Sequence, residues 1–123
     1  MKMTNNEIYG AANLLMEHFQ DNSLKLPVKV NFYLQKNKKL LIELAQDIEK
    51  NRMDIANQYG TLNEQTGQYQ VEQDKIEEAS NELNELFNLE QDVKIYKVSI
   101  EDFKDEFVLT TGQMDALMFM IED

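Results

Sequence analysis

Residues 27–60 read PVKVNFYLQKNKKLLIELAQDIEKNRMDIANQYG, and the rest of the predicted architecture is built around them. Pro27 has the fixed φ that suits the first turn of a helix, and Gly60 is the residue type that most often follows a helix end. Between the two, no proline or glycine interrupts the stretch. The pattern therefore predicts one helix from Pro27 to Tyr59, about 50 Å long at the usual rise per residue.

Apolar side chains recur along this helix at intervals of seven residues, which is typical of a coiled-coil seam. One row consists of Leu34, Leu41, Ile48 and Ile55. A second row consists of Val30, Asn37, Leu44 and Asn51, in which the two asparagines are polar interruptions. The excess apolar surface of such a helix must pack on the first helix, on the C-terminal half or on a second copy. We expect a homodimer in which the row from Leu34 to Ile55 is the self-association surface.

Helix-capping signals mark two other helices. Thr4 and Glu7 have the spacing of a capping box, and apolar residues at helical spacing follow them. Thr110 and Gln113 repeat the pattern before a final helix. Gly10 interrupts the first helix at a cost of about 1 kcal/mol relative to alanine, and a close helix crossing would explain it.

Between these helices, the pattern alternates between strand and helix. Residues 63–67 predict a turn, residues 69–71 predict a short strand, and residues 76–87 predict a helix with one apolar face. A second strand is predicted over residues 93–98. The two strands can pair into a small ribbon, which needs to pack on the helices to be stable.

We expect a single domain that spans residues 1–123. Its predicted fold class is α+β and predominantly α, with a long central helix, shorter helices and a small two-stranded β-ribbon. Residues 1–60 would form a helical hairpin that contains the long helix, and residues 61–123 an acidic β-α-β-α part. A length of 123 residues, 42% of them hydrophobic, suffices for one modest core.

The composition argues against an enzyme. With no Cys and one His, the chain lacks the residues for thiol catalysis, thiolate metal sites, disulfides and multi-histidine zinc sites. Its four glycines are scattered and form no phosphate-binding loop. The acids within residues 101–106 lack the spacing of an EF-hand. We therefore predict no catalytic residue, no cofactor and no metal site.

The net charge of −11 is concentrated in the C-terminal half. Residues 1–62 carry eight Lys or Arg against seven Asp or Glu, whereas residues 63–123 carry four Lys against sixteen Asp or Glu. This balance disfavours direct binding to nucleic acid or to an anionic membrane. The lysines within residues 25–39 are expected to pair with the acidic half, either within one chain or across a dimer.

Four acids define a candidate partner-binding face on the helix predicted over residues 76–87. They are Glu77, Glu78, Glu82 and Glu85, and we place them opposite the apolar face. Such a face can occupy a nucleic-acid-binding groove of another protein, because it presents negative charge where the groove binds phosphates. The alternative is that these acids only keep the protein in solution.

The last helix is rich in methionine. Met114 and Met118 share a face with Leu117, so we expect them in the core. Phe119 and Met120 point elsewhere, and we expect them to form a second partner-binding surface, since methionine adapts to varied partners.

The chain shows no membrane-spanning or signal segment. No stretch contains the roughly 20 consecutive apolar residues that a spanning helix needs. Polar residues follow Met1 and Lys2 at once, which leaves no apolar core for a signal peptide. We therefore expect a cytoplasmic protein.

The chain carries TNNE at residues 4–7, KLPVKV at 25–30, ELNEL at 82–86, VKI at 93–95 and LTT at 109–111. With these segments the sequence resembles a family of small uncharacterised proteins of phages and prophages in Gram-positive bacteria. The resemblance covers most of the chain. It implies a phage protein that acts in the host cytoplasm and has no enzymatic activity.

These observations favour a non-enzymatic phage protein that acts by binding another protein. It would inhibit a host or defence factor through an acidic surface that resembles nucleic acid. The alternative is a structural or assembly accessory protein of the phage particle. A metal-binding protein or an enzyme is a minor alternative.

Overall fold

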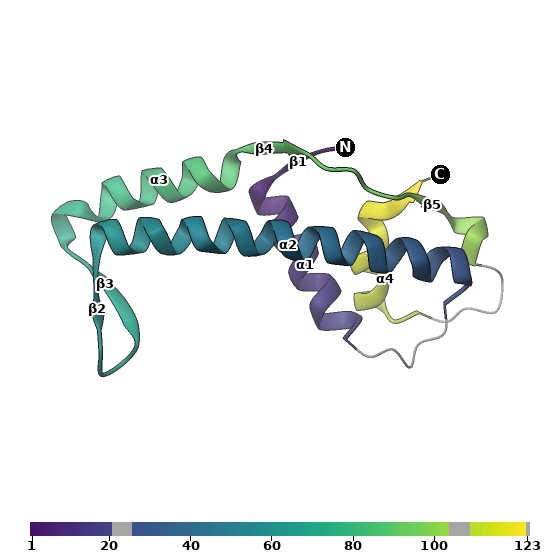
Figure 1. Ribbon diagram of the computed structural model, residues 1–123, viewed down its shortest axis with the longest axis horizontal. Coiled ribbons are helices and arrows are strands. Elements are labelled where there is room, and N and C mark those ends of the chain that lie inside the picture. Colours follow the sequence, from purple (N-terminus) through teal and green to yellow (C-terminus); the bar gives the residue numbers. More distant parts are fainter. Residues whose placement is uncertain (21–25, 104–108, 123) are drawn as a thin grey trace.

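The computed structural model describes residues 1–20, 26–103 and 109–122 (Figure 1). Its central element is α2, a 32-residue helix over Val28–Tyr59 that runs along most of the molecule. The predicted long helix is thus confirmed. Pro27 is its N-cap residue, and Gly60 follows it with an extended backbone (φ −124°). Gly60 therefore ends the helix by leading straight into a strand, without the left-handed turn that is common after helices.

Two shorter helices pack with the N-terminal part of α2. Together with the other described residues outside 49–88 they form what we call the head of the molecule. α1 (Asn5–His18) packs across α2, and α4 (Thr111–Leu117) packs on α1. Both begin with the predicted capping boxes, at Thr4–Glu7 and at Thr110–Gln113. The head core buries Ile8, Ala12, Leu15, Val30, Leu34, Leu41, Val98, Ala116, Leu117 and Met120.

Beyond the head, the chain forms a projecting arm, which we define as residues 49–88. Here the C-terminal part of α2 packs on α3 (Ile76–Asn88), which runs in the opposite direction (Figure 1). A hairpin of β2 (Gly60–Asn63) and β3 (Gln68–Val71) lies at the far end, and a 3-10 turn over Gln73–Lys75 leads into α3. The predicted helix and the first predicted strand are both present in the arm.

The strands form separate two-stranded sheets. Besides the β2–β3 hairpin, β1 (Lys2–Thr4) pairs antiparallel with β4 (Glu90–Asp92), and β5 (Val98–Ser99) pairs parallel with β6 (Ile121–Glu122). The expected pairing between the two predicted strands is therefore wrong. Closing a short hairpin costs less chain entropy than joining strands across an intervening helix, so β3 pairs with its sequence neighbour β2. The second predicted strand, residues 93–98, is also wrong, because strand structure covers Glu90–Asp92 and Val98–Ser99. Val93 exchanges backbone hydrogen bonds with Met1, and Tyr96 is bonded to Asn37 of α2.

Buried asparagine amides join segments that are distant in the sequence. The Nδ2 of Asn37 donates to the carbonyl of Tyr96 (2.8 Å), and its Oδ1 accepts from the backbone N–H of Tyr96 (2.8 Å). The Nδ2 of Asn5 donates to the carbonyl of Leu86 (2.8 Å), and its Oδ1 accepts from Nε2 of Gln91 (2.7 Å). The polar interruption at Asn37 is therefore a cross-link between α2 and the segment that follows β4.

The apolar row expected to form a dimer seam is largely covered by its own chain. Leu34, Leu41 and Ile48 are 1%, 0% and 3% exposed, and Ile55 is half-buried in the arm. The expectation that this row is a free self-association surface is wrong, because α1 packs on one part of α2 and α3 on the other. The long helix needs no second copy to bury the row.

The C-terminal methionines reverse the places expected for them. Met114 and Met118 are 40% and 61% exposed, whereas Met120 is fully buried and Phe119 packs half-buried against the core. After α4 the chain continues as a 3-10 turn over Met118–Met120. A 3-10 turn has 3.0 residues per turn where an α-helix has 3.6, so its side chains point in other directions than those of an α-helix. The docking surface predicted at Phe119 and Met120 is therefore wrong.

Gly10 lies on an exposed face of α1, and a Cβ at this position would meet no atom within 4 Å. The close helix crossing expected there is absent. Gly10→Ala should raise the free energy of unfolding by about 0.5–1 kcal/mol, because glycine loses more backbone entropy in a helix. Urea denaturation measures this change. Gly112→Ala is the contrasting variant: its Cβ would force the imidazole of His18 to move, so it should gain less stability than Gly10→Ala. A loss of stability in Gly10→Ala would contradict the open surroundings of Gly10.

Candidate functional site

The arm carries an excess of negative charge. Residues 49–88 contain nine Asp or Glu against three Lys or Arg. Two of these three cations lie beside acids of the arm itself, since Arg52 binds Glu49 and Lys75 lies 4.0 Å from Glu72. Most acids of the arm are therefore not neutralised from within it.

Three of the four acids predicted for the partner-binding face lie together on the exposed side of α3. They are Glu77, Glu78 and Glu85. None of the ion pairs between described residues involves them. Glu77 and Glu78 stand in the first helical turn, where the helix dipole favours negative charge, while the neighbouring Ala79 is buried. We call Glu77, Glu78 and Glu85 the acidic row.

Glu82 departs from the acidic row. It is half-buried and accepts a hydrogen bond from the hydroxyl of Tyr59 in α2 (2.9 Å). This bond raises the pKa of Tyr59, because the carboxylate favours the protonated phenol. The placement of Glu82 opposite the apolar face is wrong, because position 82 follows the buried Ala79 by three residues and shares its side of the helix. Glu82 fastens α3 to the end of α2.

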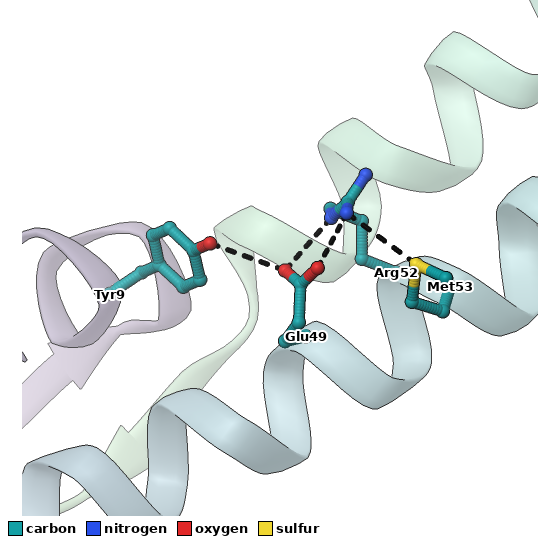
Figure 2. Close-up of polar contacts among 4 residues, drawn as sticks. All are labelled: Tyr9, Glu49, Arg52 and Met53. Carbon is teal, nitrogen blue, oxygen red and sulfur yellow. Dashed lines mark hydrogen bonds and ion pairs between the residues drawn. The ribbon is translucent and has the colours of Figure 1, made fainter. Parts of the chain in front are cut away.

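The root of the arm is fixed by Tyr9, Glu49 and Arg52 (Figure 2). The hydroxyl of Tyr9 donates to Oε2 of Glu49 (3.2 Å), and the guanidinium of Arg52 donates to both carboxylate oxygens. The hydrogen bonds from Arg52 lower the pKa of Glu49, whereas burial and then the charge of Glu49 raise the pKa of Tyr9. The ring of Tyr9 also packs edge-to-face with the ring of Phe87, with the two ring centroids 5.9 Å apart. α1, α2 and α3 are therefore tied together where the arm leaves the head.

Acid should weaken this root. Because the pKa of Glu49 is lowered in the folded chain, its stabilising contribution is present above the unfolded value of 4.5 and is lost as the pH falls through the folded value. Urea denaturation at about pH 6 and about pH 3 should show a smaller acid-induced loss of stability in Glu49→Gln than in the wild type. Glu43→Gln, at an exposed position of α2, is the control and should behave as the wild type. Equal losses in Glu49→Gln and the wild type would contradict the anchoring role of Glu49.

Of the lysines in the N-terminal half of α2, Lys29 pairs with the acidic half as expected, but among the described residues none of them forms an ion pair with the arm. Nζ of Lys29 lies 3.2 Å from Oδ2 of Asp102 in the 3-10 turn Ile100–Phe103, and Nζ of Lys38 donates to the carbonyl of Phe19 (2.8 Å). The N-terminal half of α2 and the arm lie at opposite ends of the molecule (Figure 1). Within the part of the chain that the structure describes, no ion pair joins these lysines to the arm.

Aromatic rings beside these lysines form a second surface, which the sequence pattern did not reveal. The ring centroids of Tyr33 and Tyr96 are 5.3 Å apart. Part of this surface could have been found in the sequence, because Lys29, Tyr33 and Lys36 follow one another at helical spacing. The contribution of Tyr96 could not, because only its backbone hydrogen bonds to Asn37 bring it to α2.

Other polar groups that could carry chemistry have structural surroundings or lie apart. The imidazole of His18 packs against Gly112 of α4, and its side chain is 27% exposed. Within residues 1–20, 26–103 and 109–122, no three His, Cys, Asp or Glu side chains are grouped so that they could hold a metal ion. None of the described helices combines the length and apolar character needed to cross a membrane. The acids at 104–108 lie outside the described residues.

No family model, curated protein or solved structure matches the chain. The acidic row is the predicted site that the structure brings together on one helix, and its scaffold is anchored at both ends.

Proposed function

We propose that this chain is a non-enzymatic phage protein that inhibits a host or defence factor by placing its acidic arm in that factor's nucleic-acid-binding groove. The observation that carries the proposal is the acidic row on α3, which is exposed and has no cationic partner among the described residues. The resemblance to small phage and prophage proteins supports the phage setting and action in the host cytoplasm.

The acidic row has a charge spacing that a phosphate-binding groove would accept. Glu77 and Glu85 are eight residues apart in one helix, which separates them by about 12 Å along its axis. One strand of DNA carries a phosphate about every 3.4 Å, so the same length of strand holds three or four charges. The acidic row therefore spans the length of a short piece of one strand, with two carboxylates at one end and one at the other, and a groove lined with Lys and Arg would attract them.

The arm presents these carboxylates on a fixed scaffold. α3 is fastened to α2 by the bond between Tyr59 and Glu82, and the root is held by Tyr9, Glu49 and Arg52. A helix fixed in this way loses less conformational entropy on binding than a free acidic segment does. Solubility alone requires no such geometry, so the anchoring favours the binding interpretation.

Capture from host lysate tests the proposal. The immobilised wild type should retain a nucleic-acid-binding protein from nuclease-treated lysate at about 0.05 M salt and release it at about 0.5 M, because salt screens exposed charges. The triple variant Glu77→Gln, Glu78→Gln and Glu85→Gln should bind this protein about tenfold more weakly, or more weakly still.

A matched control removes the same charge outside the arm. The variant Glu17→Gln, Glu43→Gln and Asp115→Asn changes three exposed acids, and it should capture the partner as the wild type does. Circular dichroism checks that both triple variants keep the fold. Equal capture by the acidic-row variant and the wild type would contradict the proposal and leave solubility as the role of the row. Capture of virion components instead would favour the assembly alternative.

A further inference from the structure

At the end of α2 opposite the arm, basic and aromatic side chains form a surface that we call the lysine–aromatic cluster. It consists of Lys29, Phe32, Tyr33 and Lys36 of α2 together with Lys94 and Tyr96 of the segment after β4. The ring centroids of Phe32 and Tyr33 are 6.2 Å apart, and those of Tyr33 and Tyr96 are 5.3 Å apart. The Nζ atoms of the three lysines stand 5.4 to 5.9 Å from the centroids of these rings. Cation–π attraction therefore helps to place the three ammonium groups on one surface.

The cluster has both charge and apolar surface to offer a partner. No ion pair among the described residues involves Lys36 or Lys94. Val28 and Phe32 are 88% and 55% exposed, and Ile100 in the adjoining 3-10 turn is 61% exposed. Free ammonium groups next to exposed apolar side chains suit an acidic helix that also carries apolar residues.

The chain itself contains a helix of this kind. α3 exposes Glu77 and Glu85, and Ile76 and Leu89 at its two ends are 48% and 52% exposed. This helix does not reach the cluster of its own chain, because it packs beside the C-terminal part of α2 while the cluster lies at the N-terminal part (Figure 1). The complementary helix must therefore come from another molecule.

We propose that the lysine–aromatic cluster of one copy binds α3 of a second copy in an antiparallel dimer. In Figure 1, α3, β4 and the segment that leads to β5 follow one another along the same side of α2. A two-fold axis through the middle of that side places α3 of each copy on the cluster of the other. The same contact then forms twice, as in an isologous dimer. Its surface is distinct from the buried apolar row.

Nucleic acid is the other anion that a basic and aromatic surface attracts, and it fits less well. A long polyanion would extend beyond the cluster along a molecule whose net charge is −11. Between two copies, charges more than about 10 Å apart are largely screened at 0.1 M salt, so the local pairing of lysines with glutamates dominates. Leu89, four residues after Glu85 and 52% exposed, also brings an aliphatic side chain to the contact.

The dimer does not rest on the proposed function, although both use α3. A basic partner of the acidic arm would have to displace the second copy, so the dimer would limit partner binding. Substitutions in the lysine–aromatic cluster distinguish the dimer from partner binding, because they should break the dimer and leave the acidic row intact. The variant Lys36→Glu with Lys94→Glu should therefore still capture the partner proposed above.

A charge exchange tests the dimer. One variant carries Lys36→Glu and Lys94→Glu, and the other carries Glu77→Lys and Glu85→Lys. At about 0.05 M salt and at concentrations up to about 1 mM, sedimentation equilibrium should give the wild type a mass twice its 14.4 kDa. Each variant alone should be monomeric, with a dimer Kd raised about a hundredfold or more, because like charges then meet at both contacts.

Mixing the two variants should restore the dimer. Each acidic cluster then faces a basic α3, and each basic cluster faces an acidic α3, so a one-to-one heterodimer is expected. A wild type that stays at 14.4 kDa over the whole concentration range would overturn the proposal. A mixture that stays monomeric would also overturn it. The proposal would also be overturned if the wild type formed no dimer but bound labelled single-stranded DNA, and if the variant Lys36→Glu with Lys94→Glu lost that DNA binding.

Discussion

Replacing Asn37 with alanine is expected to lower the free energy of unfolding by about 3 kcal/mol. The amide is fully buried, and its two hydrogen bonds of 2.8 Å both go to the backbone of Tyr96. Alanine leaves the N–H and the carbonyl of Tyr96 without these partners, and an unsatisfied buried group costs about 1–3 kcal/mol. For a chain of this length the melting temperature should fall by about 10–15 °C.

Thermal denaturation followed by circular dichroism measures this loss, and Asn51→Ala is the matched control. Asn51 belongs to the same heptad row, but it is exposed and its Nδ2 donates only to the carbonyl of Asp47 (2.9 Å). Its replacement should change the stability by less than about 0.5 kcal/mol. Hydrogen exchange at the Tyr96 amide should accelerate only in Asn37→Ala. Similar effects of the two substitutions would contradict the cross-link between α2 and residues 93–97.

Leu41→Glu is expected to unfold the chain at neutral pH. Leu41 is 0% exposed in the core of the head. Its replacement removes about 2 kcal/mol of apolar burial and places an unpaired carboxylate in the core, which costs several kcal/mol more. The sum is comparable to the whole stability of a typical domain, about 5–15 kcal/mol. The far-UV circular dichroism signal of the helices should therefore be lost.

Leu14→Glu serves as the control, because Leu14 of α1 is 37% exposed and can turn a carboxylate into solvent. This variant should keep the fold. Sedimentation distinguishes unfolding from the loss of a dimer seam. A Leu41→Glu variant that stays folded and only becomes monomeric would contradict the structure, and it would restore the apolar row as a self-association surface.

The helices were predictable from the sequence because their signals act within one turn. The capping boxes at Thr4–Glu7 and Thr110–Gln113 and the boundaries at Pro27 and Gly60 all lie where the sequence predicted them. A cap satisfies backbone groups of its own helix, so its recognition requires no knowledge of the rest of the fold.

Contacts between distant segments were not predictable in the same way. Asn37 binds backbone groups of Tyr96, and every non-proline residue carries such groups, so the sequence does not identify the partner. β1 pairs with β4 through Met3 opposite Gln91, a pairing that depends on how α1 and α3 pack. A small two-stranded ribbon is present as predicted, but its strands are β2 and β3. The expected pairing was wrong because strand propensity does not specify the neighbouring strand.

The candidate site was predictable where helical periodicity alone decides it. Glu77 and Glu85 are exposed as the period of α3 predicts, whereas Glu82 lies at the border of the face and binds Tyr59. At Met120 the prediction failed because a 3-10 turn replaces the expected α-helix. The lysine–aromatic cluster required the placement of Tyr96, which only the folded chain provides.

If the acidic arm occupies a groove that otherwise binds nucleic acid, as we propose, then protein and nucleic acid must compete for the partner. The most direct test is competition between labelled protein and duplex DNA for the purified partner. DNA should displace the wild type, so that its apparent Kd rises in proportion to the DNA concentration. The triple variant Glu77→Gln, Glu78→Gln and Glu85→Gln should fail to displace DNA. A complex that holds the partner, the DNA and this protein together, with unchanged affinities, would contradict the claim.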